Sequence, residues 1–155
     1  MIFEEKEYVI DDKKVILRSA KPSDAETMIT YLKTVCGETR FLMYESDEIQ
    51  YTLSEEITFI NSHNESKEAM LILAFVDGKY AGNCSFEGKF GSRRVKHRAG
   101  IGIALYQKYT GFGLGRLMLN CLLKEIETAG YEQAELTVVE GNDRAYRLYQ
   151  SLGFN

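Results

Sequence analysis

The sequence predicts a single α/β domain with a mixed, mostly antiparallel sheet and helices on both faces. Three observations support this fold class: a short, nearly continuous apolar run over 70–76, a strongly amphipathic pattern over 114–129, and the alternation of strand-like and helix-like segments along 155 residues. A short apolar run of this kind is typical of a central strand covered on both sides. A chain of this length is expected to form one core.

The first segments predict a strand hairpin and then a helix. Residues 7–19 have the composition of two strands, with a turn at 11–12. The helix that follows is expected to begin at Ser23, a good N-cap residue with Glu26 at the capping-box spacing. Gly37 is expected to end this helix.

The middle of the chain predicts a second helix and a strand hairpin. Thr52 and Glu55 repeat the capping-box spacing at the start of the second helix. Asp77-Gly78 is a strong hairpin signal between the apolar run and a returning strand over 80–87. The remaining expected elements are a polar turn at 88–94, a strand at 96–106, a helix at 114–129, a strand at 134–139 and a helix at 143–152.

Composition excludes several classes of protein. A net charge of −4 argues against a general nucleic-acid binder. The N-terminal residues are acidic where a secretory signal is basic, and no stretch approaches the roughly 18 apolar residues of a membrane span. Three widely separated cysteines, Cys36, Cys84 and Cys121, fit reduced thiols rather than a disulfide framework or a zinc site. We therefore expect a cytoplasmic protein without nucleic-acid, membrane or metal partners.

A glycine-rich turn lies between the strand at 96–106 and the helix that follows it. A helix begins with backbone N–H groups that have no partner and with the positive end of its dipole. Because Gly111, Gly113 and Gly115 carry no side chains, a phosphate can approach these groups closely, and Arg116 adds a positive charge. The pattern predicts a turn that binds a pyrophosphate.

Other glycine-rich turns that bind phosphate have patterns that differ from this one. The P-loop pattern G-x-x-x-x-G-K-[ST] is absent from the sequence. A dinucleotide-binding turn belongs near the start of a long βαβ array, whereas only 40 residues follow Gly115. A turn that merely packs a helix against a strand remains the structural alternative.

The strand before the turn has an unusual alternation. Over 100–105, the even-numbered residues are small and the odd-numbered residues are large and aliphatic, so the two kinds point to opposite faces of the strand. One face is therefore expected to pack into the core, while the other lets a ligand approach the backbone. A cofactor running from an open strand edge to the glycine turn would explain both features.

The last helix places two polar side chains on one face. Tyr149 follows Asn142 by seven residues, which brings the two directions to within roughly 20° around the helix. The alternative interpretation is that Asn142 only caps the helix and that Tyr149 only packs in the core.

The glycine turn, followed by Asn142-x-x-Ala145-x-x-x-Tyr149-x-x-x-Gly153-Phe154, resembles the GNAT superfamily of N-acetyltransferases. The resemblance covers almost the whole chain in element order. It implies transfer of an acetyl group from acetyl-CoA to an amine. In such proteins the turn binds the CoA pyrophosphate, and the preceding strand pairs with the pantetheine arm. The cofactor-binding residues it implies are Ile103, Leu105, Tyr106, Gly111, Phe112, Gly113, Leu114, Gly115, Arg116, Asn142 and Tyr149.

Three departures from the family pattern are visible. Thr110 stands where the family usually has Arg or Gln, so phosphate contacts there are expected to be weaker or to come from Arg116. Thr137 stands where similar ribosomal-protein alanine acetyltransferases have a base Glu. The family continues past Gly-Phe into another strand, so residues 1–155 are expected to form a single domain without its C-terminal strand.

Amine acetylation needs a neutral amine, a stabilised oxyanion and a proton for the departing thiolate. We expect direct attack on the thioester, with the oxyanion bound by the backbone N–H of Leu105 or Tyr106 and the sulfur protonated by Tyr149. Glu87 and His97, at the ends of two central strands, are the candidate bases. Solvated strand-end residues would give the same pattern in the sequence.

The expected acceptor is an amine of a small molecule or peptide. The resemblance places an acceptor wall between the first two helices, where Glu38, Glu45, Asp47, Glu48, Phe41 and Tyr44 are candidates. A non-catalytic acyl-CoA-binding or regulatory module is the main alternative, and a domain that binds ATP or NAD is a third. The open sheet edge after Val139 has room for a second copy of the chain, so a homodimer is a further expectation.

Overall fold

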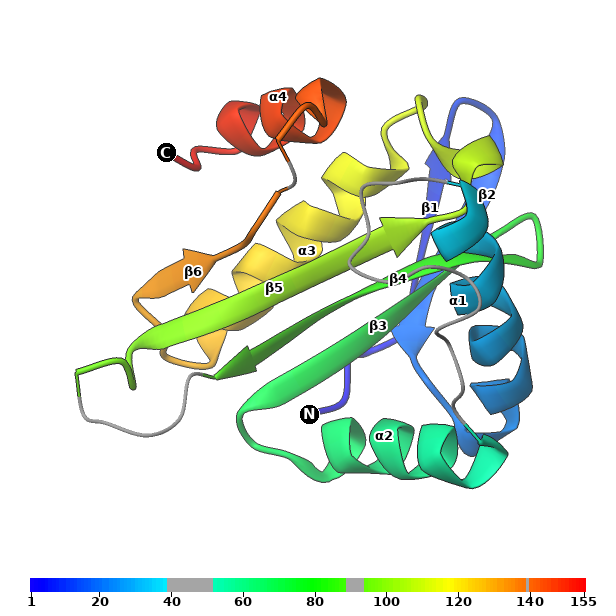
Figure 1. Ribbon diagram of the computed structural model, residues 1–155, viewed down its shortest axis with the longest axis horizontal. Helices are drawn as coiled ribbons and strands as arrows, with labels where there is room; N and C mark the ends of the chain where they lie inside the picture. Colours follow the sequence, from blue (N-terminus) through cyan, green and yellow to red (C-terminus); the bar gives the residue numbers. More distant parts are fainter. Residues whose placement is uncertain (39–51, 89–93, 139) are drawn as a thin grey trace.

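The computed structural model describes residues 1–38, 52–88, 94–138 and 140–155. Within these residues six strands form one sheet in the order β1 to β6 (Figure 1). Neighbouring strands are antiparallel except for β5 and β6, which are parallel. The predicted mixed, mostly antiparallel sheet is therefore confirmed. The strands are β1 (Lys6–Ile10), β2 (Lys13–Ser19), β3 (Ala69–Val76), β4 (Lys79–Gly88), β5 (Arg98–Leu105) and β6 (Gln133–Glu135).

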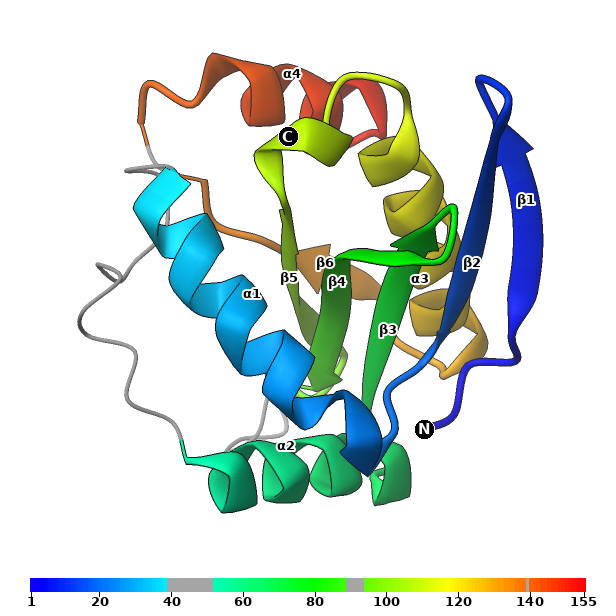
Figure 2. The same cartoon turned by 90° about the vertical axis from the view of Figure 1, so that its right-hand side faces the viewer.

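Helices cover both faces of the sheet, as Figure 2 shows. Alternate residues of β3 serve two cores: Met70 and Ile72 pack in the cluster under α3, whereas Leu71 and Leu73 pack in the cluster under α1 and α2. This explains why the run over 70–76 is apolar at every position. The helices are α1 (Ala25–Glu38), α2 (Leu53–Glu65), α3 (Leu114–Thr128) and α4 (Asp143–Ser151). None of those described is long and apolar enough to cross a membrane.

The capping-box prediction is right for α2 and wrong for α1. The hydroxyl of Thr52 accepts from the backbone N–H of Glu55 at 3.1 Å, as the spacing predicted. Before α1, however, Asp24 accepts from the backbone N–H of Lys21 at 2.7 Å, and Ser23 lies inside a short 3-10 turn. Asp24 is held in place by Arg18 at 2.8 Å, which explains why the carboxylate rather than the hydroxyl does the capping.

Both predicted hairpin turns are present. Asp11, Asp12, Asp77 and Gly78 all have positive φ, as two-residue hairpin turns require. Two other boundaries differ from the prediction. Gly37 lies within α1, which extends to Glu38. The predicted strand at 134–139 is reduced to β6, because its pairing with β5 stops after three residue pairs.

Gly82 in β4 allows a close approach of β5. A Cβ atom at this position would lie 2.7 Å from Leu105 Cδ2 and 2.8 Å from Leu105 Cα, and it would also collide with the carbonyl oxygen of Ala104. Any side chain at 82 would therefore push the C-terminal end of β5 away from β4. Gly102 differs, since a Cβ atom there would meet only Ser85 Oγ, at an ordinary 3.6 Å.

We expect Gly82→Ala to destabilise the fold, because the added methyl group overpacks the contact between β4 and β5. Overpacking typically costs about 1–3 kcal/mol, and each kcal/mol lowers the melting temperature of a domain this size by about 2–4 °C. Thermal unfolding followed by circular dichroism measures the effect. Gly102→Ala is the matched control and should leave the melting temperature nearly unchanged. Equal melting temperatures for the two variants would contradict the close approach.

Candidate functional site

β5 loses one neighbour halfway along its length. It pairs with β6 only at Arg98, Ala99 and Gly100, after which β6 and the following chain turn away from it (Figure 1). On its other edge β5 stays paired with β4 as far as Leu105. The free edge beyond Gly100 therefore belongs to a strand that is held firmly on its opposite side.

The direction of the backbone groups on this edge follows from the β4 register. The N–H of Tyr106 donates to the carbonyl of Ala81 at 2.9 Å. Because residues of an antiparallel pair alternate between bonding inward and outward, the backbone groups of Ile103 and Leu105 point to the free edge. Of the two N–H groups expected to bind an oxyanion, that of Tyr106 is engaged within the sheet, while that of Leu105 points outward.

The free edge leads into the N-terminus of α3. Gly113 is the N-cap residue, with a left-handed φ of 96°, and no side chain in the described part of the chain caps the helix by a hydrogen bond. The N–H of Leu117 bonds to the carbonyl of Gly113, so the N–H groups of the three preceding residues lie in the uncapped first turn. Their partial positive charges make this end of α3 suited to an anion.

A groove of about 450 Å³ joins these two features, and we call it the edge groove. It extends from the end of β5, over the glycine turn and the start of α3, to α4. Eight of the predicted cofactor-binding residues line it, together with Ala104, Thr110, Arg144, Ala145 and Leu148. The eight are Ile103, Leu105, Gly111, Gly113, Gly115, Arg116, Asn142 and Tyr149.

Three predicted residues have side chains that do not line the edge groove. Leu114 is buried in the core under α3. Phe112 is partly buried beneath the amino group of Lys13, which lies 4.6 Å from the ring centre. The ring of Tyr106 packs edge-on against Tyr31, with 5.0 Å between ring centres. Their predicted contacts with a cofactor would therefore involve backbone atoms.

Two arginines supply positive charge to the edge groove. Arg116 donates to Ser151 Oγ at 2.8 Å, and Arg144 donates to Thr110 Oγ1 at 3.2 Å. The guanidinium of Arg144 also lies 2.7 Å from the position that a Cβ atom on Gly111 would occupy. Sequence reasoning missed Arg144. Its only local signal is a position in the first turn of α4, two residues after Asn142.

Asn142 and Tyr149 reach the edge groove from α4. Asn142 is the N-cap residue, and its side chain accepts from the N–H of Ala145 at 3.4 Å, so it caps the helix and lines the groove at once. Tyr149 is half-buried, and its burial raises the pKa of the phenol above its ordinary value. A tyrosine with a raised pKa stays protonated at neutral pH and can donate a proton.

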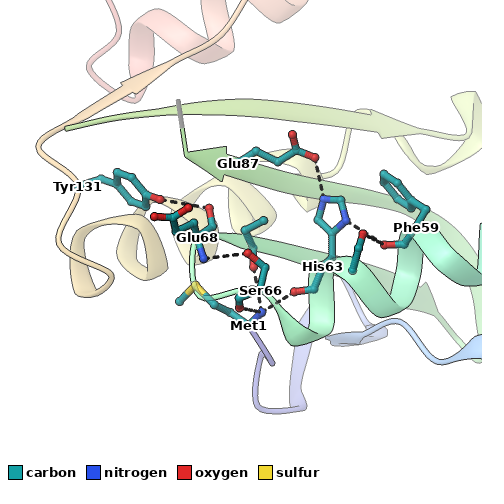
Figure 3. Close-up of polar contacts among 9 residues, drawn as sticks. Met1, Phe59, His63, Ser66, Glu68, Glu87 and Tyr131 are labelled. Carbon is teal, nitrogen blue, oxygen red and sulfur yellow. Dashed lines mark hydrogen bonds and ion pairs between the residues drawn. The ribbon is translucent and has the colours of Figure 1, made fainter. Parts of the chain in front are cut away.

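The two predicted bases lie away from the edge groove. Glu87 is opposite Gly100, whereas Leu105 is opposite Gly82. Five residues of strand therefore separate the Glu87 level from Leu105, which is about 17 Å. Glu87 Oε1 instead lies 2.9 Å from His63 Nε2 at the end of α2 (Figure 3).

The surroundings of Glu87 belong to a structural junction. His63 also contacts the carbonyl of Phe59 through Nδ1 at 3.0 Å, and the N-terminal amino group of Met1 donates to the carbonyls of His63 and Ser66 (Figure 3). His97 precedes β5, and its carbonyl accepts from the N–H groups of Glu132 and Gln133 at 3.0 and 3.1 Å. Neither Glu87 nor His97 lines the edge groove.

A second cavity lies on the other face of β5. This helix-side pocket, as we call it, has a volume of about 310 Å³ and shares Ala104 with the edge groove. It is lined by Met28, Tyr31, Leu32, Glu55, Glu56, Phe59, Asn83 and Ala104. The acceptor-wall candidates Glu45, Asp47, Glu48, Phe41 and Tyr44 lie outside the described residues, as does the side chain of Glu38. In the described part of the chain, no three His, Cys, Asp or Glu side chains gather as metal ligands would.

The sequence matches the model of the Acetyltransferase (GNAT) family over residues 36–154. This chain belongs to the GNAT acetyltransferase family. The family match extends from the end of α1 to the residues just after α4 and so includes the edge groove. A search of curated proteins gives no match.

Solved structures support the same family. A GNAT-family acetyltransferase from Streptococcus pneumoniae is 31% identical and superimposes with a TM-score of 0.85, over 91% of this chain and 84% of that one. The fold is also similar to yncA from Salmonella typhimurium, a structure with its cofactor acetyl-CoA, at 18% identity and a TM-score of 0.79 over 91% and 79% of the two chains. The paia N-acetyltransferase from Thermoplasma acidophilum, in complex with coenzyme A, gives 19% identity and a TM-score of 0.75 over 91% and 89%.

We expect Tyr149 to ionise only above the ordinary tyrosine pKa of about 10, because burial disfavours the phenolate. Titration at 295 nm, taken as the difference between the wild type and Tyr149→Phe, isolates this residue. Tyr146→Phe provides the control, since Tyr146 lies on the same helix and is 52% exposed. An ionisation of Tyr149 at or below the ordinary tyrosine pKa of about 10 would contradict the effect of burial on this residue.

Proposed function

We propose that this acetyltransferase moves the acetyl group of acetyl-CoA to a primary amine of a small molecule or peptide by direct attack. The observation that carries the proposal is the continuity of the edge groove. The unpaired edge of β5 runs directly into the uncapped N-terminus of α3. A cofactor with an amide-bearing arm and a pyrophosphate requires hydrogen-bonding partners in that order.

The residues of the edge groove fit acetyl-CoA in both shape and charge. The pantetheine amides would bond the outward backbone groups of Ile103 and the outward carbonyl of Leu105, extending the sheet where β6 leaves it. The pyrophosphate would bond the N–H groups at the start of α3, with Arg116 and Arg144 neutralising its charge. The volume of about 450 Å³ lies within the usual range for ligand pockets. Fold relatives crystallised with acetyl-CoA or coenzyme A give further support.

The chain supplies two groups for the chemistry. The N–H of Leu105 would donate to the oxyanion that forms as the amine attacks the thioester carbonyl. Tyr149 would protonate the sulfur as the carbon–sulfur bond breaks, and its raised pKa keeps that proton available at neutral pH. The product is an amide, and the leaving group departs as the thiol of coenzyme A.

A non-catalytic acyl-CoA-binding module of the same fold is the second candidate. It is favoured by the position of Glu87 and His97, because neither predicted base lines the edge groove. Steady turnover on any amine excludes this candidate. Tight binding of coenzyme A without transfer across a broad panel of amines would favour it.

We expect acetyl-CoA and coenzyme A to raise the melting temperature, and ATP and NAD to raise it much less, because only the first two bear the pantetheine arm. Gly113→Ala should reduce the shift, since it distorts the turn at the phosphate site. The control is Gly130→Ala at the other end of α3, where φ is 93° against 96° at Gly113. Both variants should lose about 1–2 kcal/mol of stability. Equal thermal shifts in both variants, or no shift in the wild type, would exclude the cofactor assignment.

We expect Tyr149→Phe to lower kcat by about 10²–10⁴-fold with little change in acetyl-CoA affinity, because the ring remains and only the proton donor is lost. Release of coenzyme A thiol, followed under conditions where chemistry limits turnover, measures this effect. Tyr146→Phe should keep the wild-type rate, since Tyr146 lies outside the edge groove. An unchanged kcat in Tyr149→Phe would overturn the role of Tyr149.

A further inference from the structure

Glu56 occupies a position where an apolar side chain would normally be found. It lies on the buried stripe of α2 with Ile60 and His63, and only 8% of its surface is exposed. Burial raises the pKa of its carboxyl group above the ordinary value. The structure gives this carboxylate no hydrogen bond or ion pair with any residue it describes. Its oxygens are not among the fully buried unpaired atoms, so they keep contact with solvent in the pocket. A carboxylate that is so largely withdrawn from water and has no partner among the described residues still costs stability, so its presence calls for a functional reason.

A second buried polar group lines the same pocket. Tyr31 on α1 is only 2% exposed and lines the helix-side pocket beside Glu56. Its hydroxyl approaches the backbone of Asn83 but makes no hydrogen bond with a described residue. The hydroxyl oxygen is itself buried, so Tyr31 contributes its aromatic ring to the wall of the helix-side pocket.

The remaining lining of the helix-side pocket defines the chemistry of that ligand. Phe59, which is 40% exposed, forms an apolar wall with Met28 and Leu32. Among the described residues, the lining contains two carboxylates, those of Glu55 and Glu56, and no Lys or Arg. A cation that bears an apolar group is the best match, since its charge faces a carboxylate and its carbon skeleton faces aromatic and aliphatic side chains.

The helix-side pocket meets the edge groove at one residue. Ala104 lines both cavities, one on each side of β5. This is also the end of β5 where Leu105 turns its backbone toward the edge groove. A ligand in the helix-side pocket would therefore approach the thioester of acetyl-CoA bound in the edge groove, and it would do so from the face of the sheet opposite to α3.

We propose that the helix-side pocket binds the acceptor as a primary ammonium ion next to an apolar group, and that Glu56 accepts its proton. This inference rests on the proposed function for the transfer step, but the binding step is independent of it. The ammonium nitrogen gives one proton to the Glu56 carboxylate and then bonds to the thioester carbon. The carbon–sulfur bond breaks, the second nitrogen proton is lost as the amide forms, and the sulfur leaves as a thiol with the proton of Tyr149. The tyrosine then regains a proton, so one proton in total passes to solvent.

The charges around Glu56 determine whether its ionisation raises or lowers the stability of the folded protein. The titratable groups that face it are Glu55 on α2, Tyr31 on α1 and Tyr80 on β4, and none of them is a cation. Because the folded protein holds the Glu56 proton more tightly than the unfolded chain does, stability falls as the pH rises from the unfolded pKa through the raised folded pKa, and the whole loss is present above the folded pKa. Removal of the charge should therefore leave the melting temperature at pH 7 unchanged or raise it.

The first test compares Glu56→Gln with Glu65→Gln in steady-state transfer to phenethylamine. Glu65 is the matched control, because it lies on the same helix but is exposed and outside both cavities. Glu56→Gln should lower kcat/KM at least about tenfold, the loss typical of a charge-assisted hydrogen bond, and should remove the acid limb of the pH profile. It should keep the wild-type thermal shift with acetyl-CoA. Equal kcat/KM in the two variants, or a lowered melting temperature in Glu56→Gln, would overturn the role of Glu56.

The second test measures binding without transfer. Ligand-detected NMR with phenethylamine should show binding to the wild type and to Glu65→Gln, and at least about fivefold weaker binding to Glu56→Gln. Phenylacetate, which carries the opposite charge on a similar skeleton, should not bind. Equal binding of phenethylamine by the wild type and Glu56→Gln, or of phenylacetate and phenethylamine by the wild type, would overturn the inference. Binding that depends on Glu56 in a protein that transfers no acetyl group would uphold this inference and refute the proposed function.

Discussion

The separation of β6 from β5 after three residue pairs is the constraint on which the rest of the site depends. Because β4 holds the other edge of β5, the strand keeps its shape while its outward backbone groups are left for a ligand. α4 then packs across the end of the opening, where Leu148 lies 3.5 Å from the position of a Cβ atom on Gly115. Asn142, Arg144 and Tyr149 reach the edge groove only because α4 lies there.

β5 lies between the two cavities, because successive residues of the strand point to opposite faces of the sheet. Its aliphatic residues Ile103 and Leu105 pack toward the core under α3, whereas Ala104 packs toward α1 and α2. A small residue at this position leaves space on the helix side of the strand, and Gly82 lets β4 stay close behind it. Under the proposed function, the donor and the acceptor therefore meet across a single strand.

Local spacing predicted what depends on neighbouring residues in the chain, such as the glycine turn and the Asn142–Tyr149 face. It could not predict what depends on distant packing. Arg144 reaches the glycine turn through a contact with Thr110, 34 residues away, and nothing in its own segment indicates this. Glu56 resembles a solvated charge in the sequence, because its burial comes from α1. Glu87 stays a predicted base, and its place opposite Gly100 depends on the β4–β5 register, which local spacing does not reveal.

The two cavities differ in how much of each is formed by main-chain groups and how much by side chains. The edge groove combines the outward main-chain groups of β5, the main chain of the glycine turn and side chains of α3 and α4 such as Arg116 and Tyr149. The helix-side pocket is formed by side chains of α1 and α2, of which Phe59 and Glu55 are exposed. If the two cavities hold acceptor and donor as proposed, mutational drift can alter the choice of acceptor one side chain at a time, while the main-chain part of the donor site is inherited intact.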